Sequence, residues 1–325
     1  MSRKRWLLIC FLLTINSIVG QETFPIYQDY LSDNVYLVHP AAAGIGECGK
    51  IRLTALTQWL GTENGPELQT ASFHAKTNNE TKAAYGIVVF NDKNGFHSQT
   101  GIQGTYAYHL ELDKEDAFKQ LSFGLSLSAV QNRVDQSSFR AFDPEVEQII
   151  QSEFYVNADF GLGYHNQGFS SYFTIKNIFL TAKNNLRSEF DALNLRNYII
   201  GAGYFFGDQS KYQFEPSIMI QYKEQTSEKI VDFNFKVYKN FKKSQIWAAV
   251  SYRTSFDGNS FEEAQYVSPI LGVNFNRTMI SYTYTKQLGE ILLTNNSFHQ
   301  ITLGFNVLCR QKRLAACPNI NGSLF

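Results

Sequence analysis

In the stretch QLSFGLSLSAV, residues 120–130, apolar side chains alternate with Ser and Gly from Leu121 to Ala129. One face of the extended chain would carry Leu121, Phe123, Leu125, Leu127 and Ala129, and the other Ser122, Gly124, Ser126 and Ser128. Successive side chains of a β-strand point to opposite faces, so this period of two predicts a strand with one apolar and one polar face. The same pattern recurs at residues 152–165, 212–222 and 298–307.

About fourteen such segments, each roughly ten residues long, can be counted, which is the length that a tilted strand needs to cross a bilayer. They lie near 51–60, 67–76, 82–91, 99–112, 119–131, 152–165, 168–180, 195–207, 211–223, 229–239, 244–255, 264–275, 277–287 and 298–308. We therefore predict an all-β fold, a transmembrane antiparallel up-and-down β-barrel of about 14 strands over residues 51–308. Pro216 and Pro269 fall inside two segments, where each removes a ladder donor and predicts a bulge or a strand end.

The polar face of these segments favours an enclosed lumen over bulk water. Its residues are mostly Ser, Gly and Asn, and charged residues make up only 18% of the chain. The alternative is a soluble secreted β-sandwich or repeat domain, but aromatic residues reach 15% and its outer surface would be too apolar.

The connections between segments support the barrel independently. Those at 166–168, 207–210, 240–243 and 275–277 are short, whereas the others are longer, notably 132–151, 181–194, 256–263 and 288–297. Short periplasmic turns and long extracellular loops are typical of outer-membrane barrels. An even strand number would leave both chain ends in the periplasm, including a C-terminal tail at 309–325.

Residues 1–20 resemble a secretory signal peptide, with three basic residues before the apolar run at 6–15. Removing Arg3, Lys4 and Arg5 from the 29 basic residues leaves 26 against 29 acidic ones, so the exported chain is close to neutral. A chain this close to neutral gives no indication of nucleic-acid binding. The prediction is a protein of the bacterial outer membrane, in contact with its lipid.

Residues 21–50 precede the first strand, and FPIYQDYLSDNVYLVHPAAAGIG (24–46) is too broken for a helix. A fourteen-stranded cylinder is wider than its own side chains can fill. We predict that 21–50 is a periplasmic or plug segment in which tyrosines fill space, Pro40 and Gly44 shape turns and the alanine run approaches the wall. Lumen-facing residues of both signs suggest either a hydrated pore or an interior neutralised by a plug; they are Asp159, Glu215, Asp232, Lys236 and Arg253.

No catalytic pattern stands out. The 6 His residues are scattered singly, and neither a Gly-x-Ser-x-Gly elbow nor a His-Glu-x-x-His pair occurs. The prediction is therefore a protein that is not an enzyme and has neither cofactor nor metal. Cys309 and Cys317 are close enough in sequence to form a disulfide, which would leave Cys48 free; the alternative is that all three are small residues without a redox role.

The first part of the chain resembles a known family. YLSDNVYLVHPAAAG, RLTALTQWLG, NGPELQTASFHA and YGIVVFNDKNG followed by TGIQGTYAYHL are similar to the PorP/SprF outer-membrane proteins of Bacteroidota, which accompany the type IX secretion system. The matching positions are Tyr36, His39, Pro40, Ala41, Gly44, Arg52, Gln58, Trp59, Gly65, Pro66, Asn91, Asp92 and Gly95. His39 stands where the family usually has Asn, a difference that bears on the local cap or turn.

The resemblance implies a role without catalysis. Members support the secretion of one cognate protein with a type B C-terminal domain, often a large gliding adhesin, and hold it at the cell surface. The expected partners are such an adhesin, bound by the long loops, and components of the secretion machinery. The alternative function is a porin or a channel for hydrophobic solutes.

Overall fold

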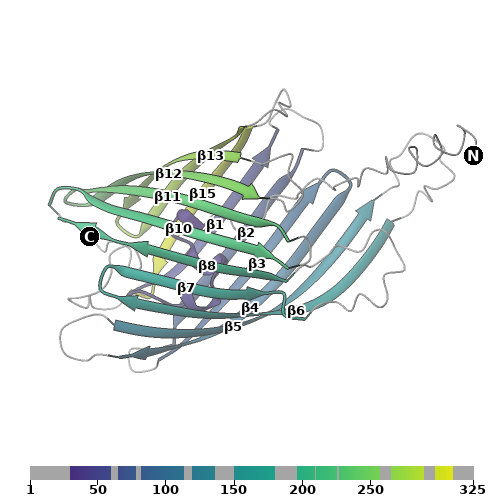
Figure 1. Cartoon of the computed structure of the whole chain (residues 1–325), viewed down its shortest axis with the longest axis horizontal. Coiled ribbons are helices and arrows are strands. Elements are labelled where there is room, and N and C mark those ends of the chain that lie inside the picture. The colour runs from purple at the N-terminus through teal and green to yellow at the C-terminus, as the bar shows by residue number, and fades with distance from the viewer. Residues whose placement is uncertain are drawn as a thin grey trace, which may run out of the picture.

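The chain forms a closed antiparallel β-barrel in the computed structural model (Figure 1). The structure describes residues 30–59, 65–77, 82–112, 119–135, 150–179, 196–208, 210–224, 227–256, 265–288 and 297–309. The strands are β1 (Gly49–Gln58), β2 (Glu67–Lys76), β3 (Ala83–Asn94), β4 (His97–Glu111), β5 (Lys119–Asp135), β6 (Ile150–Asn166), β7 (Phe169–Lys176), β8 (Asn197–Tyr204), β9 (Phe206–Gly207), β10 (Gln213–Lys223), β11 (Lys229–Asn240), β12 (Ser244–Phe256), β13 (Gln265–Phe275), β14 (Thr278–Leu288) and β15 (Ser297–Val307).

Each strand pairs with its neighbours in sequence, and β1 pairs with β15 to close the barrel. The short β9 continues β8 in the same register against β10, so the wall has 14 strands. Closure matters because it leaves neither β1 nor β15 with an open edge, as a sheet surrounded by lipid requires. The predicted fold and strand number are confirmed.

The two faces of the wall have the polarity that the sequence predicts. On β5, Leu125 and Leu127 point outward and are 50% and 56% exposed, whereas Ser122 and Ser126 point inward and are buried. Large apolar side chains thus cover the outside and small polar ones line the inside, as in a barrel that faces lipid. Within the described ranges, no helix is long and apolar enough to cross a membrane.

At both prolines the pairing between two neighbouring strands is interrupted. The register is the same on either side of each interruption. The pairing of β10 with β8 stops at Ser217, next to Pro216, and resumes with β9 at Phe214. Between β8 and β9, the Phe205 N–H donates to the Gly168 carbonyl. At Pro269, the pairing of β13 with β14 skips two positions and then resumes. Each proline therefore removes a ladder bond, as predicted, but neither produces a bulge or ends the strand.

The connections that were named as short and long follow the predicted alternation, but some of the others do not. The link between the third and fourth strands should have been one of the longer ones. Instead β3 and β4 run on until Asn94 pairs with His97, which leaves a turn of Gly95 and Phe96. Gly95 has a φ of 60°, a conformation that glycine adopts at little cost.

Candidate functional site

Residues 30–48 lie inside the barrel, where Figure 1 shows them as the purple segment enclosed by the wall. We call this segment the plug. It has two 3-10 turns, η2 (Val35–Leu37) and η3 (Pro40–Ala42), and η3 packs against β4, β5 and β6. Its apolar side chains form one core with inward-facing residues of the wall, including Ile199, Met219 and Trp247. This confirms the predicted plug-like segment; residues 21–29 lie outside the described part.

Polar bonds tie the plug to strands around the whole barrel. Asn34 donates to the Ser72 hydroxyl at 3.1 Å, and Tyr36 donates to that of Thr105 at 2.8 Å. The Gly44 N–H donates to His74 Nδ1 at 2.8 Å, and the Ala43 carbonyl lies 2.9 Å from His109 Nε2. Lys176 and Lys236 donate to the plug carbonyls of Leu37 and Leu31 at 3.2 and 2.9 Å. These contacts come from β2, β4, β7 and β11, so no single strand holds the plug.

Asp33 is one of the two acidic residues of the plug, the other being Glu47. Lys50 and Arg52 of β1 contact its carboxylate at 3.1 and 2.9 Å. Burial works to raise the pKa of Asp33, but the neighbouring cations Lys50, Arg52 and Lys236 outweigh it and hold the pKa below its usual value. Asp33 is therefore ionised and anchors the plug to the first strand.

A second charged group joins β11, β12 and the plug. Arg253 Nε and Nη2 contact the two oxygens of Asp232 at 2.6 and 2.7 Å, and the Tyr30 hydroxyl donates to Asp232 at 3.2 Å. Glu215 accepts a bond from Tyr238, and Lys176 lies 3.6 Å from Asp159. The charge pairs among these residues thus lie within the wall, and the plug adds hydrogen bonds from Tyr30 to Asp232 and from Lys236 to the Leu31 carbonyl.

Glycines in the wall let the plug backbone come close. A Cβ on Gly124 of β5 would collide with the backbone of Pro40 and Ala41. One on Gly161 of β6 would lie 3.1 Å from the Ala41 nitrogen, and one on Gly86 of β3 would collide with the Tyr36 ring. Gly44 has a φ of 68°, so it supplies the turn expected of it.

His39 bonds to the wall and does not cap its own turn. It precedes η3 but makes no side-chain cap bond. Its Nδ1 lies 2.8 Å from the Thr174 hydroxyl, and its ring stacks on Tyr172 with centroids 4.8 Å apart. Burial, with a smaller contribution from the Lys176 ammonium, lowers the pKa of His39 to about 3, so the ring is neutral.

The predicted motif residues fall into two separate groups. Tyr36, His39, Pro40, Ala41 and Gly44 belong to the plug, and Arg52 contacts it. The remaining ones lie at the other end of the barrel, in and beside the β1–β2 and β3–β4 connections: Gln58, Trp59, Gly65, Pro66, Asn91, Asp92 and Gly95. There the Gln58 N–H donates to the Pro66 carbonyl at 2.8 Å, and Trp59 packs against Leu56, Leu68 and Phe298.

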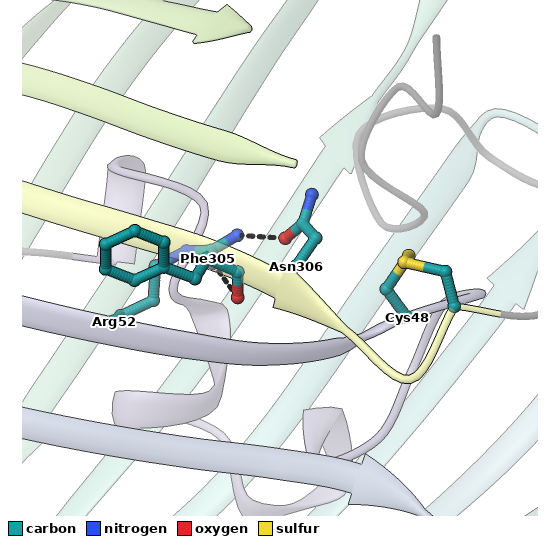
Figure 2. The surroundings of a disulfide bond; sticks show 5 residues. Cys48, Arg52, Phe305 and Asn306 are labelled. Atoms are coloured by element: carbon teal, nitrogen blue, oxygen red, sulfur yellow. Dashed lines mark hydrogen bonds between the residues drawn. A yellow bond between two sulfur atoms is a disulfide. The ribbon is translucent and has the colours of Figure 1, made fainter. Parts of the chain in front are cut away.

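The predicted Cys309–Cys317 disulfide is wrong, because Cys309 is bonded to Cys48 across 261 residues of sequence. Figure 2 shows the bridge where the plug enters β1 and β15 ends. Barrel closure pairs Gly49 with Val307 and so brings the two cysteines together. Arg52 reinforces this seam by donating to Asn306 Oδ1 at 3.2 Å (Figure 2). Cys317 lies outside the described residues.

Sequence reasoning missed several anchors of the plug, above all Asp33, Lys50, Thr174 and Lys176. The strand pattern places Lys50 and Arg52 on the same face of β1, two residues apart, which is a usable signal for a buried anion. Within the described ranges, no cluster of His, Cys, Asp or Glu could hold a metal ion.

Comparison with known families then identifies the chain. The family described as "Type IX secretion system membrane protein PorP/SprF" matches residues 19–305. The chain belongs to the PorP/SprF family. This PorP/SprF protein thus has the family and fold of a membrane component of a secretion system, and neither is that of a known enzyme class. Family and barrel together place it in the outer membrane.

Among curated proteins, nothing matches this PorP/SprF chain. Solved structures similar to it are outer-membrane barrels of low sequence identity. Omp33 of Acinetobacter baumannii is 8% identical, with a TM-score of 0.42 over 81% of this chain and 99% of that one. BamA of Haemophilus ducreyi, without POTRA domains 1–3, is 10% identical, with a TM-score of 0.41 over 80% and 70%. OmpF of Salmonella typhi is 10% identical, with a TM-score of 0.39 over 79% and 96%.

Proposed function

We propose that this barrel binds one cognate protein exported by the type IX system, supports its secretion and anchors it at the cell surface. The partner would carry a type B C-terminal domain and would be a large surface or gliding adhesin. Membership of the PorP/SprF family is the observation that carries this proposal. Other components of the secretion machinery would contact the periplasmic side.

The topology supports one orientation. β1 begins and β15 ends at the same end of the barrel, beside the turns 167–168, 241–243 and 276–277. In the orientation usual for outer-membrane barrels, that end and both termini face the periplasm. The long connections predicted at 132–151, 181–194, 256–263 and 288–297, most of whose residues lie outside the described part of the chain, would then face the outside and dock the adhesin.

The filled lumen favours an anchor over the alternative function, a porin or hydrophobic-solute channel. The plug is held by hydrogen bonds and ion pairs from β1, β2, β4, β7 and β11, and its apolar side chains share one core with the wall. A conducting pore would need this contact network to open. We expect the intact protein to be silent in single-channel recordings.

Co-purification from detergent-solubilised outer membranes tests the proposal. The tagged barrel should bring down a protein with a type B C-terminal domain. Replacing 180–195 by a Gly/Ser segment of equal length should weaken this capture, whereas replacing the turn 208–212 at the opposite end should not. If no such protein co-purifies and the adhesin stays cell-attached after deletion of the barrel gene, the proposal fails.

A further inference from the structure

A cavity of about 100 Å³ lies between the plug and the part of the wall formed by β7, β8 and β10. It is partly open and reaches Ser170, near the start of β7, and Gly203, near the end of β8. Both residues are close to the turns 167–168 and 208–212. The cavity therefore sits toward the barrel end where the strands are joined by short turns.

The cavity exists because the wall residues that line it have small side chains or none. Ser170, Gly201, Gly203 and Ser217 line one side. Across from them, the plug presents Leu31, Val35 and Ile45, and Met219 adds to the apolar surface. The rings of Tyr36 and Tyr172 complete the lining. The cavity is smaller than the roughly 150 Å³ apolar cavity that accepts benzene, so a single ring is the largest group it suits.

Two buried imidazoles at the cavity have spare hydrogen-bonding atoms. His74 accepts the Gly44 N–H on Nδ1, so its proton is on Nε2 and that atom is a donor. His39 uses Nδ1 with Thr174, and its Nε2 faces Gly201. Both side chains are 3% exposed, and among the described residues neither Nε2 atom has a hydrogen-bond partner. Neither atom is among the fully enclosed polar atoms that lack a partner, so both are reachable from the cavity and can bond to a ligand there.

The charged groups at the cavity already have ion-pair or hydrogen-bond partners in the protein. Asp33 pairs with Lys50, Lys236 donates to the Leu31 carbonyl, and Glu215 accepts from Tyr238. An ionic ligand would have to compete with these contacts. A neutral molecule would leave them in place.

We propose that this cavity binds a small neutral aromatic molecule that carries a hydroxyl group, such as a phenol. The ring would lie against Leu31, Ile45 and Met219. A hydroxyl group both donates and accepts, so it can bond to either Nε2 atom. Because the lining belongs partly to the plug and partly to the wall, the ligand would hold the two together and stabilise the docked plug. This inference does not rest on the proposed adhesin function.

The test uses the full-length protein in lipid nanodiscs and 4-fluorophenol as the probe, observed by ¹⁹F NMR. We expect saturable binding above that of empty nanodiscs, with a Kd on the order of 0.1–1 mM for a ligand of this size. At a probe concentration of about ten times Kd, amide exchange in residues 31–45 should slow roughly tenfold.

Substitutions in the wall locate the site. Ser217→Leu would fill the cavity from β10 and should weaken binding about tenfold or more, since pocket volume discriminates strongly between ligands. Ser251→Leu is the matched control, because Ser251 is an equally small residue of the inner face on β12 that does not line the cavity. Ser170→Leu fills the same cavity from β7 and replaces Ser217→Leu if that variant does not fold.

Two outcomes would overturn the proposal. Binding no greater than that of empty nanodiscs means that the cavity holds only water. Saturable binding that both cavity-filling variants leave unchanged means that the probe binds elsewhere.

Discussion

At Gly124 one added carbon would decide whether the plug fits. The Cβ of any other residue would collide with the Pro40 carbonyl carbon and the Ala41 nitrogen, which are backbone atoms that cannot rotate away. Gly124 is also one of the polar-face positions of the strand pattern at 120–130. Its role there is to leave room, and a period of two does not reveal which small inward residue meets another segment.

Gly124→Ala should loosen the plug. Overpacking of this kind costs about 1–3 kcal/mol, and here the cost falls on plug docking. Amide exchange of residues 36–44 should therefore speed up while the strands stay protected. Gly104→Ala is the control, because a Cβ at Gly104 meets nothing within 4 Å. Equal protection of the plug in both variants would contradict the close approach of Ala41 to β5.

His39 should make plug docking sensitive to acid. Its pKa is lowered to about 3 in the docked plug, while an undocked imidazole has a pKa of about 6.5. Below pH ~6.5 only the undocked form takes up the proton, so docking weakens by up to about tenfold per pH unit as the pH falls toward about 3. Above pH ~6.5 both forms are neutral and this effect disappears.

The measurement is plug protection by hydrogen exchange at pH 7 and pH 5, corrected for intrinsic rates. His39→Asn introduces the usual residue of the family and should reduce the loss of protection at pH 5. The comparison with the wild type isolates His39 from other titratable groups nearby, since Lys176, Tyr172 and His165 are kept in both. An unchanged pH dependence in His39→Asn would rule out His39 as the sensor.

Among the elements, the strands were predictable and the disulfide was mispredicted. Strands follow from alternation, a local property that a barrel in lipid enforces on every segment, so the predicted segments and the observed strands coincide closely. The cysteines required a non-local argument. With an even number of strands, the start of the first strand and the end of the last one lie side by side at the same end of the barrel. This reasoning favours a Cys48–Cys309 disulfide over one between Cys309 and Cys317.

Peptide mapping without reduction should recover a peptide pair that joins Cys48 to Cys309. Cys48→Ser should lower the free energy of unfolding by about 2–4 kcal/mol, because the bridge restricts the unfolded chain across a long loop. Urea-dependent unfolding in lipid vesicles measures this loss, and Cys317→Ser should cause none. Recovery of a peptide pair that joins Cys309 to Cys317 would refute the Cys48–Cys309 pairing.

The candidate site was predictable in position but not in its contacts. Pro40, the alanine run and Gly44 indicated a compact segment, and the width of the barrel indicated where it goes. The partners of Asp33 and His39 depend on how the plug is rotated inside the lumen. No local pattern encodes that rotation, since Ser72, Thr105 and Thr174 resemble many other small polar residues of the inner face.

For the whole molecule, the plug takes the place of the side chains that a narrower barrel would use to fill itself. It is bonded to strands on all sides and joined to the seam by Asp33, Arg52 and the disulfide. The wall, in contrast, closes through its own ladders, which do not involve residues 24–44. Wall and plug should therefore be separable.

Deleting residues 24–44 should leave a folded barrel and open a conductance in planar lipid bilayers. The deletion keeps Cys48, Lys50 and Arg52, so the seam and the disulfide remain. It leaves the polar residues that contacted the plug facing water, which they tolerate because a hydrated lumen satisfies their hydrogen bonds. The intact protein should be silent, and Gly124→Ala, which only weakens docking, should open briefly and rarely. If the deleted form folds with its disulfide intact and is still silent, residues 24–44 do not seal the lumen, and the side chains of the wall must close it on their own.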